Sequence, residues 1–124
     1  MPETKIPDAS HPITIQKNPN RLRVTFAGKI VADTTRALTM QEASYPPVQY
    51  VPRADVDVSL LARTDHASYC PYKGDCSYYS IKAGGKVAEN AIWSYEAPYT
   101  AVGDIKEYVA FYPNRVDAIE QTPA

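Results

Sequence analysis

The side chains best suited to chemistry lie between residues 69 and 80. This stretch contains both cysteines of the chain, Cys70 and Cys76, together with Lys73 and four of the ten tyrosines. His66 precedes Cys70 by four residues, and Lys73 follows it by three. A nearby cation lowers the pKa of a thiol and favours the nucleophilic thiolate, so an enzyme that depends on Cys70 and His66 is one hypothesis. Buried cysteine also serves as a small apolar residue, so packing of Cys70 is the alternative.

A metal site or a nucleotide loop would be a different use of the same stretch. His66, Cys70 and Cys76 offer ligands that suit zinc, but their spacing differs from that of zinc motifs and no Cys-x-x-Cys pair is present. The dipeptide Lys73-Gly74 lacks the upstream glycine and the following hydroxyl residue of a phosphate-binding loop. We therefore expect no metal and no cofactor.

Cationic and aromatic side chains in separate parts of the chain indicate a binding site. Arg53 and Lys73 are suited to grip a carboxylate or a phosphate, and a buried tyrosine hydroxyl needs a partner that a ligand can supply. We therefore expect one pocket that binds a small anionic molecule. Its predicted ligand-binding residues are Tyr50, Arg53, Lys73, Tyr79, Trp93 and Tyr95. If chemistry occurs there, the catalytic candidates are Cys70 or His66 as nucleophile or base, and Glu96 as the acid–base partner.

Each of these roles has a structural alternative. Arg53 would instead pair with Asp55 or Asp57, and Glu96 would stabilise the start of a helix. The tyrosine-rich face would then dock a protein or a second copy of the chain, which makes the domain an interaction module or a homo-oligomer. A concave cavity favours ligand binding, whereas a flat aromatic patch favours docking.

Short alternating segments and glycine turns predict an antiparallel β domain. Residues 21–26 alternate apolar and polar side chains, and Gly28-Lys29 predicts a type II′ loop to a returning strand at residues 30–32. Gly84-Gly85 predicts a second hairpin between residues 78–83 and a strand that begins at Lys86.

The other predicted elements are shorter. Prolines bracket a strand at residues 48–51, which we expect at a sheet edge because proline cannot donate to a ladder. Residues 98–107 predict one short C-terminal helix, and residues 108–112 predict a final strand. Asp33 and Arg36 are expected to form a turn or a structural ion pair, with a place in the pocket as the alternative. The predicted fold is mainly β, a small antiparallel bent sheet or partly closed barrel with that helix against it.

The bulk properties fit one domain of 124 residues with a formal net charge of -1. We expect a flexible N-terminal arm at residues 1–11, a single domain at residues 12–117 and a C-terminal tail at residues 118–124. The charge balance and the lack of a basic run argue against nucleic acid as a partner. No stretch has the length of a signal or of a membrane span, so we expect a cytoplasmic protein that does not enter membranes.

Three blocks of sequence, at residues 48–53, 64–80 and 93–99, carry a resemblance to a known family. They include Cys-Pro-Tyr-Lys-Gly and Trp-Ser-Tyr-Glu, and the chain resembles the bacterial domain-of-unknown-function 427 family from about Pro12 to Asp117. The resemblance implies a β-rich fold similar to the Mss4-like β-tent, and it implies no reaction. Some members are labelled nucleotidyltransferases, but the glycine-serine and paired-aspartate pattern of those enzymes is missing here. Cys76 stands where relatives usually carry alanine.

Overall fold

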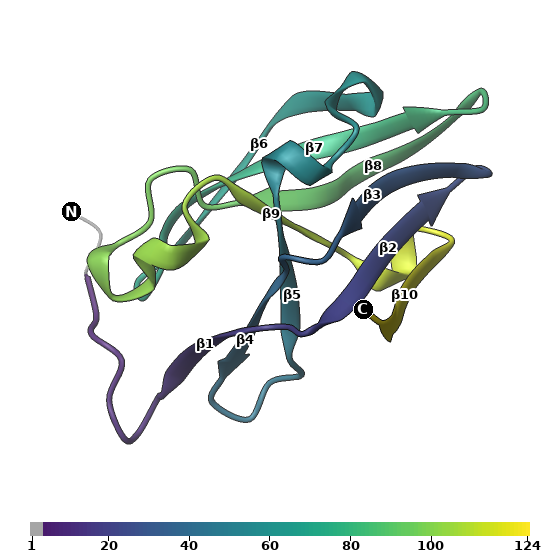
Figure 1. Cartoon of the computed structure of the whole chain (residues 1–124). Helices are drawn as coiled ribbons and strands as arrows, with labels where there is room; N and C mark the ends of the chain where they lie inside the picture. Colours follow the sequence, from purple (N-terminus) through teal and green to yellow (C-terminus); the bar gives the residue numbers. More distant parts are fainter. Residues whose placement is uncertain (1–3) are drawn as a thin grey trace.

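The computed structural model describes residues 4–124. Over these residues the chain forms ten β-strands and four 3-10 helices (Figure 1). The strands are β1 (Ile13–Lys17), β2 (Asn20–Phe26), β3 (Lys29–Thr34), β4 (Leu38–Glu42), β5 (Val48–Pro52), β6 (Leu61–Cys70), β7 (Gly74–Ala83), β8 (Lys86–Ser94), β9 (Tyr108–Phe111) and β10 (Ala118–Pro123). The 3-10 helices are η1 (Arg53–Asp55), η2 (Val58–Leu60), η3 (Thr100–Ile105) and η4 (Pro113–Arg115).

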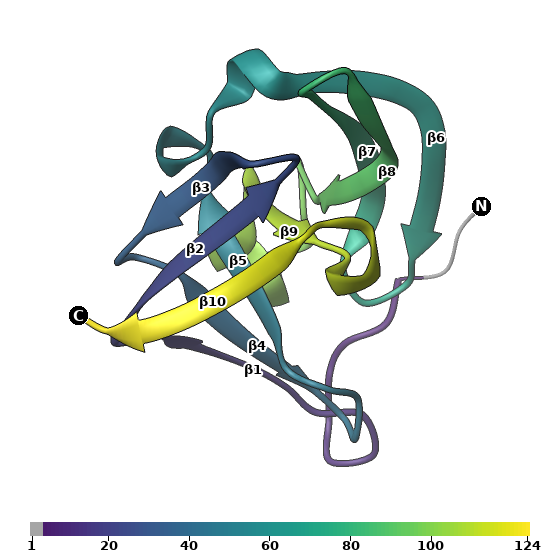
Figure 2. The same cartoon turned by 90° about the vertical axis from the view of Figure 1, so that its right-hand side faces the viewer.

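The strands form two antiparallel sheets that face each other. The larger sheet has the order β1-β4-β5-β9-β8-β7-β6, and the smaller sheet has the order β10-β2-β3. Figures 1 and 2 show the small sheet packed against the bent middle of the large one. The prediction of a mainly β, antiparallel fold is therefore confirmed, although neither sheet closes into a barrel within residues 4–124. In the same part of the chain no helix is long and apolar enough to cross a bilayer.

The two hairpins follow from backbone conformations that glycine accepts easily. Phe26 pairs with Lys29, so the first loop is Ala27-Gly28, with φ of 51° and 76°. Two positive φ values define a type I′ turn. The prediction of a type II′ loop at Gly28-Lys29 is therefore wrong in turn type, and its position is wrong by one residue. The second hairpin turns at Gly84-Gly85, as predicted.

Strand β5 lies inside the large sheet, between β4 and β9. The expectation of an edge strand is therefore wrong. Its prolines do not interrupt the ladder, because Pro52 is the last residue of the strand and Pro46-Pro47 precede it. The adjacent Val51 is fully buried.

The C-terminal part of the chain differs from the prediction in two places. Instead of a helix over residues 98–107, the structure has the 3-10 helix η3, which is interrupted by non-helical dihedral angles at Val102. The residues predicted as a tail form β10, and Ile119 of that strand pairs with Val24 of β2. The predicted strand at residues 108–112 is confirmed as β9.

The predicted N-terminal arm lies partly outside the described residues. From Thr4 onward the segment contacts the domain, since the Lys5 backbone N–H donates to the Pro71 carbonyl at 2.8 Å and Nε2 of His11 lies 2.8 Å from Oε2 of Glu42.

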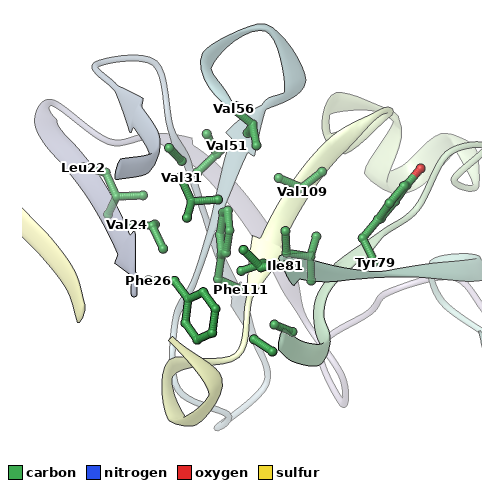
Figure 3. Close-up of a cluster of buried hydrophobic side chains, with 14 of the residues drawn as sticks. Leu22, Val24, Phe26, Val31, Val51, Val56, Tyr79, Ile81, Val109 and Phe111 are labelled. Carbon is green, nitrogen blue, oxygen red and sulfur yellow. The ribbon is translucent and has the colours of Figure 1, made fainter. Parts of the chain in front are cut away.

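Apolar side chains gather on both faces of the large sheet. The inner cluster lies between the two sheets, where Leu22 and Val24 of β2 face Val51 and Phe111 of the large sheet (Figure 3). The outer cluster covers the other face and consists of Met40, Tyr50, Cys76, Tyr78, Tyr95, Val102, Ile105 and Ala110. Neighbouring residues of β7 therefore belong to different clusters, Tyr78 to the outer and Tyr79 to the inner.

Candidate functional site

A cavity of about 260 Å³ opens beside the outer cluster, and we call it the tyrosine pocket. Strands β4, β5, β7 and β8, the β4–β5 loop and the β6–β7 turn contribute to it. Its lining residues are Met40, Glu42, Tyr45, Pro46, Val48, Tyr50, Lys73, Tyr78, Trp93, Tyr95 and Tyr112. Four of the predicted ligand-binding residues therefore meet here, namely Tyr50, Lys73, Trp93 and Tyr95.

A buried ion pair supplies the charges of the tyrosine pocket. Lys73, in the turn between β6 and β7, is 8% exposed, and its Nζ donates to Oε1 of Glu42 at the end of β4. The other carboxylate oxygen of Glu42 lies 2.8 Å from Nε2 of His11. The Lys73 ammonium also lies 5.7 Å from the centre of the Tyr95 ring, within range of a cation–π interaction.

The ion pair controls the protonation of Glu42. Burial alone would raise the pKa of this carboxyl, but hydrogen bonds from Lys73 and His11 bring it below the ordinary value. The ring of His11 stacks on Tyr72, with the ring centres 4.0 Å apart and the planes 9° apart. The N-terminal segment is thereby attached to the turn that carries Lys73.

Three phenols of the tyrosine pocket, those of Tyr50, Tyr78 and Tyr95, remain protonated at neutral pH. Burial raises the pKa of Tyr50 and of Tyr95, and it raises the pKa of Tyr78 to about 12. The Tyr50 hydroxyl accepts a hydrogen bond from Trp93 Nε1 at 3.2 Å. The hydroxyls of Tyr78 and Ser68 are 2.8 Å apart.

Both cysteines lie near the outer cluster as free thiols. Burial raises the pKa of the Cys76 thiol, which is the opposite of activation. Cys70 is half-buried and packs against the same cluster. Cys76 is thus suited to packing.

His66 is exposed on β6, and its ring packs against Tyr78 at 4.3 Å between centres. The register of β6 against β7 shifts between Arg63 and Ala67, so residues 64–66 lie in a bulge. Over residues 4–124 no hydrogen bond joins His66 to Cys70. Within the same range, no group of three His, Cys, Asp or Glu side chains is close enough to hold a metal ion.

The other predicted site residues form a separate arginine cluster, made of Arg53, Arg63, Ser77, Tyr79 and Glu96. Glu96 accepts hydrogen bonds from Arg63 Nη1 at 2.7 Å and 2.9 Å, from Tyr79 at 2.8 Å and from Ser77 at 3.0 Å. Arg53 Nη2 donates to Tyr79 at 2.9 Å and to Glu96 at 3.4 Å. Figure 3 shows the Tyr79 hydroxyl directed away from the inner cluster.

The carboxylate of Glu96 is held ionised by these donors. Burial would raise its pKa, but the hydrogen bonds from Tyr79, Arg63 and Ser77 lower it. Because its acceptor positions are engaged, the Glu96 carboxylate is better suited to holding Arg53 and Arg63 in place than to donating a proton. Nε of Arg53 is buried and has no hydrogen-bond partner among the described residues.

Two ion pairs considered from the sequence do not form, because their residues have other partners. Arg53 does not pair with Asp55, whose carboxylate is taken by Arg36 at 2.9 Å. Asp33 pairs with Arg21 at 2.6 Å, so the predicted pair between Asp33 and Arg36 is wrong.

The expected single pocket is therefore divided between two faces of the large sheet. Tyr78 and Tyr79 are consecutive in β7, and consecutive residues of a strand point in opposite directions. Tyr95 and Glu96 directly follow β8, and Tyr95 lines the tyrosine pocket whereas Glu96 joins the arginine cluster. Sequence reasoning missed Glu42, His11, Tyr78, Tyr112 and Arg63. The signal available for Glu42 was weak, because it ends an ordinary strand 31 residues before its lysine partner.

Comparison with protein families identifies the chain. A family model described as "Domain of unknown function (DUF427)" matches residues 14–122. The chain belongs to this family, as the sequence blocks predicted. Comparison with curated proteins gives no significant match.

Proposed function

We propose that this member of the domain-of-unknown-function 427 family binds a small anionic molecule in the tyrosine pocket. The observation that carries the proposal is a buried lysine in an aromatic cavity lined by tyrosine hydroxyls and the Trp93 indole. A ligand rich in acceptor oxygens, such as a carboxylate, complements this lining.

The count of donors and acceptors supports an anion. An ammonium group has three N–H donors, and within residues 4–124 the side chain of Lys73 donates to Glu42 alone. The hydroxyl of Tyr50 accepts from Trp93 and retains its own proton for donation. Each oxygen of Glu42 already has a partner, Lys73 for one and His11 for the other. The lining therefore retains free donors, namely N–H bonds of Lys73 and the hydroxyl of Tyr50, from which an oxyanion can accept.

The energetics of the ion pair also favour a binding role. A buried ion pair contributes little net stability, because desolvation of the two charges offsets most of their attraction. An apolar pair would fill the same space at no greater cost. Binding of an anionic ligand to the Lys73 ammonium would explain why a charged side chain occupies this buried position.

The volume of the tyrosine pocket limits the size of the group that it can bind. About 260 Å³ is smaller than the sites of drug-sized molecules, which occupy about 300–1,000 Å³. The part of the ligand that enters the tyrosine pocket is therefore a compact polar group.

Thermal denaturation in the presence of small anions tests the proposal. The anions tested are acetate, butyrate and phosphate, each compared with chloride at equal ionic strength. At least one of them should raise the melting temperature in proportion to the logarithm of its concentration. Lys73→Met should abolish this rise. Lys82→Met is the matched control, because Lys82 is exposed on β7. Equal stabilisation of wild type and Lys73→Met would refute the proposal, as would the lack of any stabilising anion.

Native mass spectrometry of freshly purified protein is an independent check. A retained anion should be present on the wild type and missing from Lys73→Met.

A further inference from the structure

We infer that the ligand of the tyrosine pocket is amphipathic, with an apolar tail that lies in a second hollow beside the pocket. This inference rests on the proposed function, because it takes the anionic group to be bound by Lys73. The second hollow, here called the apolar groove, has a volume of about 630 Å³. It runs between the small sheet and the β4–β5 loop, and its apolar lining includes Leu22, Val24, Phe111, Pro113 and Ile119.

The two hollows share part of their lining. Tyr45, Pro46, Val48 and Trp93 line both of them. The indole of Trp93 lies at the junction, where its Nε1 donates to Tyr50 of the tyrosine pocket. The inferred ligand places its polar group beside Lys73 and its tail along this shared lining, past Trp93.

The floor of the apolar groove is formed by the core. Leu22 and Val24 are 1% and 0% exposed, and Figure 3 shows them on β2 facing the side of the large sheet that carries Phe111. Ile119 of β10 is half-buried and forms part of the rim. A tail in this position would remove its own surface and the exposed part of Ile119 from water.

The side-chain carbonyl oxygens that line the apolar groove are already engaged by the protein. Gln49 Oε1 accepts from Asn18 at 2.9 Å and from Thr39 at 2.8 Å. Gln121 Oε1 accepts from Asn18 at 3.0 Å and from Asn20 at 3.3 Å. No charged side chain lines the groove in the part of the chain that the structure describes. The groove therefore suits a hydrocarbon, whereas the tyrosine pocket suits an oxyanion.

The chemical class that fits both hollows is a monocarboxylate with an unbranched alkyl tail. The compact carboxylate matches the small donor-rich pocket, and the tail matches the larger apolar groove. Phosphate alone would fill only the first of the two.

A homologous series of carboxylates tests this inference on the unaltered protein. Acetate, butyrate, hexanoate and octanoate are titrated below their micellar concentrations, and binding is followed by the fluorescence of Trp93, the single tryptophan of the chain. Removal of one methylene from water corresponds to a change of about fourfold in affinity, so we expect a rise of about two- to fourfold per methylene in this partly open groove. 1-Octanol, which has the tail without the charge, should bind more weakly than octanoate.

Two variants separate the contributions of the two hollows. Ile119→Gln should reduce the dependence on chain length and leave acetate affinity unchanged. Lys73→Met should weaken every carboxylate and reduce the difference between octanoate and 1-octanol. The fluorescence and melting curve of each free variant establish that it is folded.

The possible failures are distinguishable. If acetate and octanoate bind equally, the apolar tail is refuted and the proposed function stands. If octanoate and 1-octanol bind equally in wild type, the role of Lys73 as an anion site is refuted. If no carboxylate binds at all, both the inference and a carboxylate ligand are refuted.

Discussion

Replacing Lys73 with methionine should destabilise the protein by leaving a buried carboxylate without its main partner. Removing one member of a deeply buried ion pair costs about 3–5 kcal/mol. The side chains of Lys73 and Glu42 retain 10% and 16% exposure, and His11 still lies beside Glu42. We therefore expect a smaller loss in the free energy of unfolding at pH 7, about 2 kcal/mol. Methionine fills a similar volume, so cavity formation contributes little.

The loss should depend on pH in a defined direction. In the wild type the pKa of Glu42 is lowered on folding. The pairing therefore stabilises the protein above the unfolded-state pKa of Glu42, and this stabilisation disappears as the pH falls through the folded-state pKa. In Lys73→Met burial persists without the ammonium, so we expect the pKa of Glu42 to rise. The difference in the free energy of unfolding between wild type and Lys73→Met should then decrease as the pH falls from about 6 to about 4.

Urea denaturation at several pH values measures both effects. The double variant Lys73→Met/Glu42→Gln should be more stable than Lys73→Met at pH 7, because it removes the unpaired charge. Lys82→Met should match the wild type. The reasoning is refuted if Lys73→Met equals the wild type at pH 7, or if the double variant is no more stable than the single one.

Three further changes test other parts of the structure. Glu96→Gln should lower the free energy of unfolding by about 1 kcal/mol in urea denaturation, since two arginines lose their shared anion at a partly exposed site; no change would show that the arginine cluster is dispensable. Gly85→Ala should cost about 1 kcal/mol, because φ is 74° there and the space around the position is open. Gly103→Ala is its control, with open space and no positive φ; equal effects of the two would contradict the strain argument. A thiol reagent should label Cys70 before Cys76, which is 2% exposed and has a raised pKa, and rapid labelling of Cys76 in the native protein would contradict its burial.

Local patterns were sufficient to predict most of the strands. The alternation of Leu22, Val24 and Phe26 identified β2, and Gly84-Gly85 identified the β7–β8 turn, because side-chain periodicity and backbone φ depend on a few neighbouring residues. The predicted edge position of β5 failed for the opposite reason. Whether a strand is central depends on which other strands pair with it, and Pro52 carried no information about β9.

The sequence alone also located the reactive side chains, since residues 69–80 contain both cysteines and Lys73. The tertiary structure decided their partners. Lys73 meets Glu42 from 31 residues away, and Arg53 meets Glu96 from 43 residues away. Consecutive residues such as Tyr78 and Tyr79 are separated by the thickness of the sheet. Composition and spacing describe which groups are present, but the pairing of strands and the face that each side chain takes determine which groups share a site, and both depend on packing across the whole domain.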